Sequence, residues 1–323
     1  MKIEDLKIPR KSHCACVLGK YMYIAGGISQ NGEILPNVEK YDEETNKWKK
    51  VVPMNYPKMT FGLVSLKNTK TSRENMLLTL GGHPKIEQYT RKNNTWKFFE
   101  YHNCSLNSAF ATHNLHKNKV YISGGHFPDD KNSKQVLNRI FEYDPYENIW
   151  KGLPKMIKAV SNHTMVEYNN KLFIFGGMDE KFKVVNTVQM FDLETGTWTE
   201  LQGLKTPRMN HCTVVYKNLI CILGGENRMG ELEDTVEIYD PVNKIYFSSR
   251  KLPFRLTQFA SVVFNDKIYI TGGMKDDNSF SESTFIYEPL YTEMDKKIVK
   301  KSPKKYRKPS IKIVRKSVRK LKV

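Results

Sequence analysis

The sequence predicts an all-β fold made of six similar units, each roughly 50 residues long. Three observations support this prediction: a recurring glycine doublet, a short β-rich run before each doublet, and an aromatic residue after it at a nearly constant spacing. The doublets lie at Gly26-Gly27, Gly81-Gly82, Gly124-Gly125, Gly176-Gly177, Gly224-Gly225 and Gly272-Gly273. A repeat of this length is typical of solenoids and propellers, so it sets the architecture.

Each unit has the pattern of four short strands. In the fifth unit these are HCTVVY, NLICILGG, TVEIYDP and a strand that begins at Tyr246. β-branched and aromatic residues fill the runs, whereas Gly, Pro, Asn and Asp lie between them, as expected for strands joined by tight turns. The doublet suits the end of the second strand, because glycine adopts backbone conformations that other residues avoid and lets a neighbouring chain approach closely.

The aromatic positions keep the units in phase. They are Tyr41, Tyr89, Tyr143, Phe191, Tyr239 and Tyr287. The spacing between neighbours is identical in every case except the longer step from Tyr89 to Tyr143. Seven residues beyond the aromatics come Trp48, Trp96, Trp150, Trp198, Tyr246 and Met294. A four-stranded antiparallel unit has an exposed edge and a half-buried face, and a radial arrangement of six units buries each face against the next.

These motifs resemble the kelch repeat: an apolar strand ending in Gly-Gly, a Tyr-Asp pair such as Tyr41-Asp42 or Tyr239-Asp240, and a Trp a few residues later. The resemblance covers roughly residues 1–295, and four of the six units carry the aromatic, the spacing and the Trp together. It implies a six-bladed kelch β-propeller followed by a basic tail of residues 296–323. Unit 2 departs from the pattern with Thr90 after its tyrosine, and unit 6 departs with Glu288 and Met294.

Two segments could complete the last blade. The stretch LKIPRKSHC at residues 6–14 matches LKTPRMNHC at residues 204–212, which places residues 2–4 opposite the outer-strand residues 200–202. The alternative is residues 294–299 from the C-terminal side. We favour the N-terminal strand, because joining opposite chain ends fastens a ring.

The charge of the chain is concentrated at one end. The formal net charge is +18, but the tail of residues 296–323 holds 14 Lys/Arg and no acid, leaving 38 bases against 34 acids elsewhere. This distribution argues against the whole molecule being a nucleic-acid-binding surface. Several interpretations of the tail stay open: a solvated charge run, a nuclear-import signal in KKSPKKYRK, a polyanion-binding segment, or a basic amphipathic helix through Ile311, Val314, Val318 and Leu321.

The expected location is the cytoplasm, with the nucleus as an alternative if the tail binds an import receptor. The N-terminus lacks the apolar core of a signal peptide, and no run of 18 apolar residues occurs. Five cysteines without a CxxC pair suggest free thiols in a reducing compartment.

We expect no catalytic residue, no metal and no cofactor. The sequence contains no GxSxG, HExxH, P-loop or dinucleotide motif. His13, His163 and His211 each lie at the same distance before a doublet, which allows either a metal site in the channel or, as we favour, a packing position of the repeat. Kelch propellers include oxidases and mutarotases, so an enzyme with a site at the channel mouth remains the less favoured alternative.

A partner-binding rim is the favoured function. The loops after the doublets vary in length and chemistry while the strands keep phase, which is where recognition is expected on a constant scaffold. Cations near the start of most inner strands could bind an acidic peptide of a protein partner, or could instead bond within the ring. The candidate rim residues are Arg10, Lys58, Lys158, Arg208 and Arg255, with Tyr101, His102 and Phe127 as aromatic anchors.

The sequence is most similar to the propellers of kelch-like substrate adaptors of cullin-3 ubiquitin ligases. The resemblance implies a non-enzymatic interaction module, but this sequence starts within the first blade and shows no BTB or BACK domain. We therefore expect any contact with cullin-3 to run through a second BTB protein. The alternative is an actin-associated scaffold, since other kelch proteins bind actin and a basic tail would suit an acidic filament.

Overall fold

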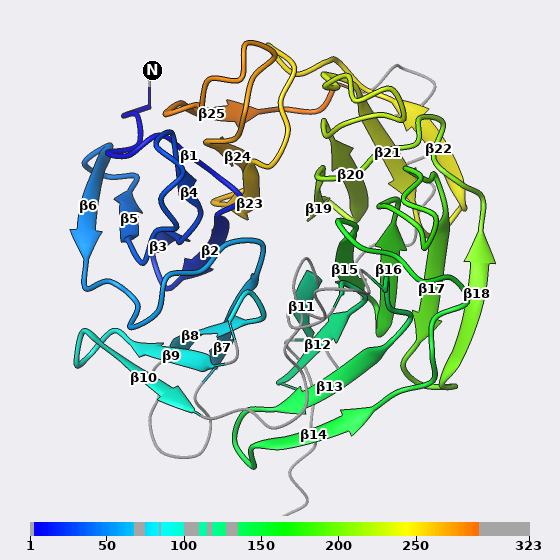
Figure 1. Ribbon diagram of the computed structural model, residues 1–323, viewed down its shortest axis with the longest axis horizontal. Coiled ribbons are helices and arrows are strands. Elements are labelled where there is room, and N and C mark those ends of the chain that lie inside the picture. Colours follow the sequence, from blue (N-terminus) through cyan, green and yellow to red (C-terminus); the bar gives the residue numbers. More distant parts are fainter. Residues whose placement is uncertain are drawn as a thin grey trace, which may run out of the picture. The chain divides into compact units, whose positions relative to one another are not determined.

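The strands form six antiparallel sheets arranged radially around a central channel (Figure 1). The computed structural model describes residues 3–67, 75–83, 85–99, 110–114, 118–126 and 135–290. Residues 1–290 form one compact unit, and the basic tail lies outside the described residues. No helix that could cross a membrane occurs among the described residues.

Each sheet, or blade, runs from an inner to an outer strand in chain order. Blade 1 contains β2 (Cys14–Leu18), β3 (Tyr21–Ala25), β5 (Val38–Asp42) and β6 (Lys47–Val51). Blade 2 contains β7 (Gly62–Lys67), β8 (Asn75–Leu80), β9 (Ile86–Thr90) and β10 (Thr95–Phe99). Blade 3 contains β11 (Phe110–Asn114), β12 (Lys119–Ser123), β13 (Ile140–Asp144) and β14 (Ile149–Gly152).

The other three blades follow the same plan. Blade 4 contains β15 (Thr164–Tyr168), β16 (Lys171–Phe175), β17 (Val188–Asp192) and β18 (Thr197–Leu201). Blade 5 contains β19 (Cys212–Tyr216), β20 (Leu219–Leu223), β21 (Val236–Asp240) and β22 (Ile245–Ser248). Blade 6 contains β23 (Ala260–Phe264), β24 (Lys267–Thr271) and β25 (Thr284–Tyr287). Outside the blades, the short strands β1 (Arg10–Lys11) and β4 (Ile28–Ser29) pair with each other.

The inner strands close a ring. Neighbouring inner strands contact each other in the order β2, β7, β11, β15, β19, β23 and back to β2. The Ser12 N–H donates to the Gln258 carbonyl at 2.8 Å, and the Leu6 N–H donates to the Glu282 carbonyl at 2.7 Å. Ile3 and Leu6 are buried in a cluster that joins blades 1 and 6. The N-terminal segment therefore fastens the last blade to the first.

Blade 6 has three strands among the described residues, so the structure leaves open which chain end supplies a fourth. Of the two candidates, Ile3 and Glu4 are described and belong to no strand, and residues 294–299 lie outside the described residues. We call the segment that joins the outer strand of one blade to the inner strand of the next a linker. The described N-terminal residues occupy the equivalent place before blade 1. The Glu4 carbonyl accepts from Trp48 Nε1 at 3.0 Å, as the linker carbonyls of Val52 and Pro154 accept from Trp96 and Trp198. This agrees with the predicted alignment of residues 6–14 with residues 204–212.

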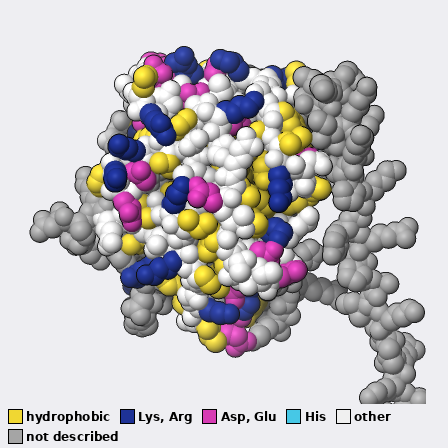
Figure 2. Space-filling model, turned by 90° about the vertical axis from the view of Figure 1, so that its right-hand side faces the viewer, with side chains coloured by type: hydrophobic (Ala, Val, Ile, Leu, Met, Phe, Trp, Pro, Cys, Tyr) yellow, Lys and Arg dark blue, Asp and Glu magenta, His cyan; other side chains and the backbone are white. Residues whose placement is uncertain are grey.

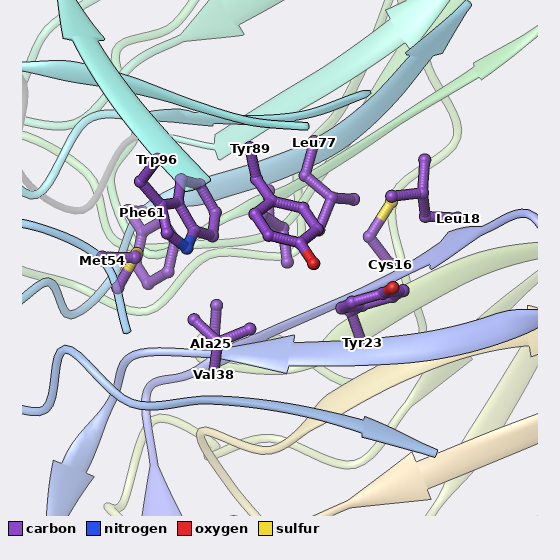
Figure 3. Packing of buried hydrophobic residues seen from close by; sticks show 11 residues of the cluster. Cys16, Leu18, Tyr23, Ala25, Val38, Met54, Phe61, Leu77, Tyr89 and Trp96 are labelled. Atoms are coloured by element: carbon purple, nitrogen blue, oxygen red, sulfur yellow. The ribbon is translucent and has the colours of Figure 1, made fainter. Parts of the chain in front are cut away.

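Apolar packing between the blades supplies the core. The second strand of each blade is covered on both faces, which is why β20 is buried along its whole length and reads as a continuous apolar run. Between blades 1 and 2, Tyr23 and Cys16 face Tyr89, Leu77 and other apolar side chains of the neighbouring sheet (Figure 3). Tyr23 and Tyr89 have ring centroids 6.0 Å apart. This burial on two faces provides the main driving force for the fold.

The repeated aromatic and Trp lie directly opposite each other on the third and outer strands. The Tyr41–Trp48 rings have centroids 5.2 Å apart, and the Tyr143–Trp150 rings 4.4 Å apart. Each of these tyrosine hydroxyls bonds an asparagine five residues later. The Trp therefore joins its own blade to the preceding linker, which explains why the pair recurs at a fixed spacing.

The doublets require glycine on steric grounds. Gly26 and Gly27 have φ of 66° and 98°, values that strain other residues. A Cβ on Gly26 would lie 2.4 Å from the Lys58 carbonyl oxygen, and one on Gly27 would lie 2.6 Å from the Lys11 carbonyl oxygen. The backbone of a linker therefore occupies the space that a side chain would need.

Candidate partner-binding rim

Two sets of loops meet on one face of the ring, which we call the rim. One set follows the doublets, and the other consists of the linkers that lead into the inner strands. Antiparallel bridges join the two sets within a blade: β1 with β4 in blade 1, Ser161 with Met178 in blade 4, Met209 with Glu226 in blade 5, and Thr257 with Met274 in blade 6. The predicted gathering of variable loops at one mouth is confirmed for these four blades.

Four of the post-doublet loops contain the same five-residue turn, at residues 29–33, 179–183, 227–231 and 275–279. In each, the first N–H donates to the fifth carbonyl and the fourth N–H donates to the first carbonyl. The fourth residue has a left-handed backbone and is Gly32, Phe182, Gly230 or Asn278. Phe182 is thus a bulky side chain at a position where the other loops have residues that tolerate this conformation.

The rim carries exposed apolar side chains. Among the described residues, Ile34, Ile157, Phe182 and Met229 are 40%, 46%, 53% and 85% exposed. All four lie in post-doublet loops or linkers. Four other large apolar side chains are comparably exposed outside these loops: Phe98, Ile149, Val242 and Leu290. The side of the ring seen in Figure 2 shows basic, acidic and apolar side chains interspersed. Exposed apolar groups on a rim suit contact with another protein.

The mouth of the channel is lined by one polar residue from each of blades 1, 2, 4, 5 and 6. Each precedes an inner strand and has a left-handed backbone, with φ between 47° and 56°: Ser12, Thr60, Asn162, Asn210 and Gln258. Their backbones bond in sequence, from Asn210 N–H to Asn162 O, Gln258 N–H to Asn210 O, Ser12 N–H to Gln258 O, and Thr60 N–H to Ser12 O, at 2.8–3.1 Å. We call this arc the collar.

The three histidines lie next to the collar and are buried. Nε2 of His13, His163 and His211 lies 2.9–3.0 Å from a Thr or Ser hydroxyl of the preceding blade. Burial lowers the pKa of His13 and of His163 to about 3 and that of His211 well below its usual value, so all three are neutral. No three His, Cys, Asp or Glu side chains in the described segments are arranged to hold a metal ion.

The cysteines at the channel, Cys14 and Cys212, are half-buried. Cys14 Sγ donates to the Phe61 carbonyl at 2.6 Å, and Cys212 Sγ donates to the Phe259 carbonyl at 2.9 Å. Burial raises the pKa of Cys212 to about 12 and also raises the pKa of Cys14, so both remain thiols at neutral pH. Such thiols are poor nucleophiles, which leaves them with a packing role.

Three of the predicted rim cations lie inside the blades. Arg10, Lys58 and Arg208 have no exposed surface. Arg10 Nη2 lies 2.5 Å from Glu39 Oε1, and Arg208 Nη2 lies 3.0 Å from Glu237 Oε1. Since a buried side chain cannot contact a partner, the prediction is corrected for these three residues: they bond within the ring.

The remaining two cations are exposed, but they are not equivalent to the buried three. Lys158 is ion-paired with Glu200 at 2.5 Å, and Arg255 makes no ion pair with the described residues. The doublet hydrogen bonds identify the equivalent positions: Gly27, Gly125, Gly177, Gly225 and Gly273 donate to the carbonyls of Lys58, Val160, Arg208, Leu256 and Arg10. Lys158 therefore lies two residues before the equivalent position in blade 4, Val160. Arg255 lies one residue before the equivalent position in blade 6, Leu256. The proposed anchors Tyr101, His102 and Phe127 lie outside the described residues.

Phe182 and the collar were missed at the level of sequence. The loops SQNGE, DEKFK, NRMGE and KDDNS all begin two residues after a doublet, so an alignment at that point shows a phenylalanine among two glycines and an asparagine. This alignment is the signal that would have identified Phe182. The collar residues share a repeat position, 14 residues before the first glycine of the doublet in four of the five blades, but they differ in residue type, so the sequence does not show that they share a backbone conformation.

Comparison with known proteins agrees with the geometry. Residues 109–305 match the family described as the KLHDC2/KLHL20/DRC7 Kelch-repeats domain, and residues 2–180 match the Attractin/LZTR1 beta-propeller. The solved structure of YjhT superposes with a TM-score of 0.71 at 13% sequence identity, covering 88% of this chain and 96% of that one. At this identity the likeness shows the fold alone.

The similar sequences are kelch-like proteins. Mouse Kelch-like protein 36 is 28% identical over 196 residues, which cover 56% of this chain and 29% of that protein. Human Kelch-like protein 15 is 24% identical over 198 residues, covering 55% and 31%. The matched part is thus less than a third of either relative. Because the first of the two family profiles alone covers more than half of the chain and the structure has the six-bladed ring, the chain belongs to the kelch-repeat β-propeller family.

Proposed function

We propose that this propeller is a non-enzymatic interaction module whose rim binds a protein partner. The observation that carries the proposal is the placement of exposed apolar side chains on loops that the bridges hold together. Ile157, Phe182 and Met229 come from a linker and two post-doublet loops, on a face built around the collar. A rigid scaffold with variable loops is well suited to recognition.

The test compares two matched double variants. Phe182→Ala with Met229→Ala removes apolar surface from the rim. Ile149→Ala with Val242→Ala removes exposed apolar surface at the opposite end of the blades. Ile149, 59% exposed, begins the outer strand β14, and Val242, 43% exposed, lies in the turn between β21 and β22. Affinity capture from cells, followed by quantitative mass spectrometry, measures which proteins each variant retains.

We expect a discrete set of proteins to be lost from the rim variant and retained by the opposite-face variant, with equal melting temperatures for both. Equal retention by both variants would contradict the proposal. Equal loss would contradict it as well, because the partner would then not distinguish the two faces.

The finer proposal is substrate recognition of the kelch-like adaptor type, supported by the similarity to kelch-like proteins. In that case immunoprecipitation recovers cullin-3 only while a second BTB protein is present, and depletion of that protein removes cullin-3 but not the rim partner. Recovery of cullin-3 that persists after depletion would argue against this arrangement.

A further inference from the structure

One position of the repeat holds a buried cation in three blades and an apolar residue in two. The cations are Arg10, Lys58 and Arg208, and the equivalent residues of blades 4 and 6 are Val160 and Leu256. The residue at the matching position of the third strand changes with it. The cations are paired with Glu39, Glu87 and Glu237, whereas the counterparts of these glutamates in blades 4 and 6 are Gln189 and Phe285.

Arg208 shows what the cation does in blade 5. Nη1 donates to the carbonyls of Gly224 at 2.8 Å and Thr235 at 3.1 Å, and Nη2 donates to Thr235 Oγ1 and Glu237 Oε1 at 3.0 Å each. Arg10 makes the equivalent backbone and carboxylate contacts in blade 1. The guanidinium therefore fills the space beneath the post-doublet loop and satisfies its acceptors.

Blade 4 keeps the acceptor but lacks the cation. Thr187 is the counterpart of Thr235, and its Oγ1 is buried without a hydrogen-bond partner in the described structure. Beside it lies a hollow of about 400 Å³, whose lining includes Val160, Val185, Thr187, Asp179, Glu180, Lys158 and Lys181. This volume is within the range of roughly 300–1,000 Å³ typical of ligand sites.

Blade 6 provides the internal comparison. There Leu256 is fully buried, and the Phe285 ring packs edge-on against Phe254 with centroids 5.4 Å apart. Larger apolar groups thus replace the ion pair and fill its space. Val160 is smaller and Gln189 bonds the Lys158 backbone instead, so the equivalent space in blade 4 stays open.

We propose that this hollow receives an arginine side chain of the protein partner, in the place that Arg10 and Arg208 occupy in their own blades. The inference deepens the rim function and rests on it. The guanidinium would bond Thr187 Oγ1 and the backbone carbonyls. The carboxylates of Asp179 and Glu180 line the hollow together with the ammonium groups of Lys158 and Lys181, so the case for arginine comes from the hydrogen-bond acceptors and not from net charge. Phe182, in the same turn as Asp179, is placed to contact residues that flank the arginine.

The experiment fills the hollow from within. In Val160→Arg the chain supplies its own guanidinium, as blades 1 and 5 do. Methyl NMR of the full chain follows Val185 during titration with N-acetyl-arginine amide and, as the neutral isostere, N-acetyl-citrulline amide. We expect saturable shifts with the arginine compound, binding about tenfold weaker for citrulline because a charge-assisted hydrogen bond is lost, and no saturable shift for Val160→Arg.

Thr187→Val is the second variant, since it removes only the unpartnered hydroxyl, and it should weaken arginine binding with an unchanged melting temperature. The inference is overturned if wild type shows no saturable shift, if citrulline binds as tightly as arginine, or if Val160→Arg responds like wild type. Capture assays separate this failure from failure of the rim function. If a partner is lost from the Phe182/Met229 variant but retained by Val160→Arg, the rim function stands and the proposal that the hollow binds an arginine fails.

Discussion

At the scale of single residues, the buried cations decide how the blades hold their loops. Burial lowers the pKa of Arg208, and the Glu237 carboxylate opposes this effect. A buried ion pair adds little compared with apolar residues of the same shape, but removal of one partner leaves an uncompensated charge and unsatisfied carbonyls. The cost of losing the arginine therefore exceeds what its contacts contribute.

Arg208→Ala should lower the free energy of unfolding by about 3–5 kcal/mol, because it leaves Glu237 buried without its cation. Arg255→Ala is the matched control, since that side chain is exposed, and it should change stability by less than about 0.5 kcal/mol. Urea denaturation monitored by tryptophan fluorescence measures both. Similar small effects would mean that the ion pair is not formed in solution.

The buried histidines predict acid sensitivity. The pKa of His163 is about 3 in the folded protein, against an ordinary value near 6.5, because burial disfavours the charged imidazole. Between these values the unfolded chain binds more protons, so stability falls as the pH is lowered from about 6.5 toward 3.

His163→Phe should reduce that slope by about 1.4 kcal/mol per pH unit. Phenylalanine is the matched replacement, since Phe61 and Phe259 occupy the same repeat position in blades 2 and 6. The free energy of unfolding at pH 6 and pH 4 gives the slope for each protein. An unchanged slope would show that His163 already titrates near its ordinary pKa in the fold.

At the scale of elements, the five-residue turn of the post-doublet loops sets the strain at the rim. Its fourth position is left-handed, and Phe182 occupies it in blade 4 with φ of 56°. A non-glycine residue in this region costs about 1–2 kcal/mol, less for asparagine. Strain held in an exposed loop is typical of functional positions.

Phe182→Asn should raise the free energy of unfolding by about 0.5–1 kcal/mol while weakening partner capture. The reciprocal change, Asn278→Phe in blade 6, should lower it by a similar amount. Thermal or urea unfolding of the two variants provides the comparison. Destabilisation by Phe182→Asn would show that the ring contributes packing that outweighs the backbone strain.

The elements also show what a sequence can reveal. Doublets, strands and the Tyr–Trp pairs were predictable because each depends on local spacing that recurs from one unit to the next. The role of the cations was not resolved, since each depends on a glutamate on the third strand of the blade, far along the chain. Lys158 lies two residues before the position that corresponds to Arg10, and only the doublet hydrogen bonds separate the two positions. The hollow of blade 4 depends on an arginine that is missing there, and only the packing of the blades reveals such a space.

At the scale of the whole molecule, stability depends on the junction of blades 1 and 6. Leu6 is 4% exposed in the cluster between these blades, and Leu204 is 2% exposed at the equivalent position before blade 5. Leu6 lies near the chain end, where segments fray easily unless they are packed.

Leu6→Ala and Leu204→Ala should each cost about 2–5 kcal/mol if the ring is closed in solution. The measured quantity is the free energy of unfolding from urea titrations. A much smaller cost for Leu6→Ala than for Leu204→Ala would indicate that the N-terminal segment detaches and that the ring opens at this junction.

The collar has a mechanical consequence for the molecule. Its amide hydrogen bonds run along the circumference, so an outward pull on blade 1, 5 or 6 is passed to both neighbouring blades. Solvent hydrogen can reach these amides only when adjacent sectors part together. We therefore expect Ser12, Asn210 and Gln258 to be among the slowest residues to take up deuterium, although they stand at the edge of an open pore.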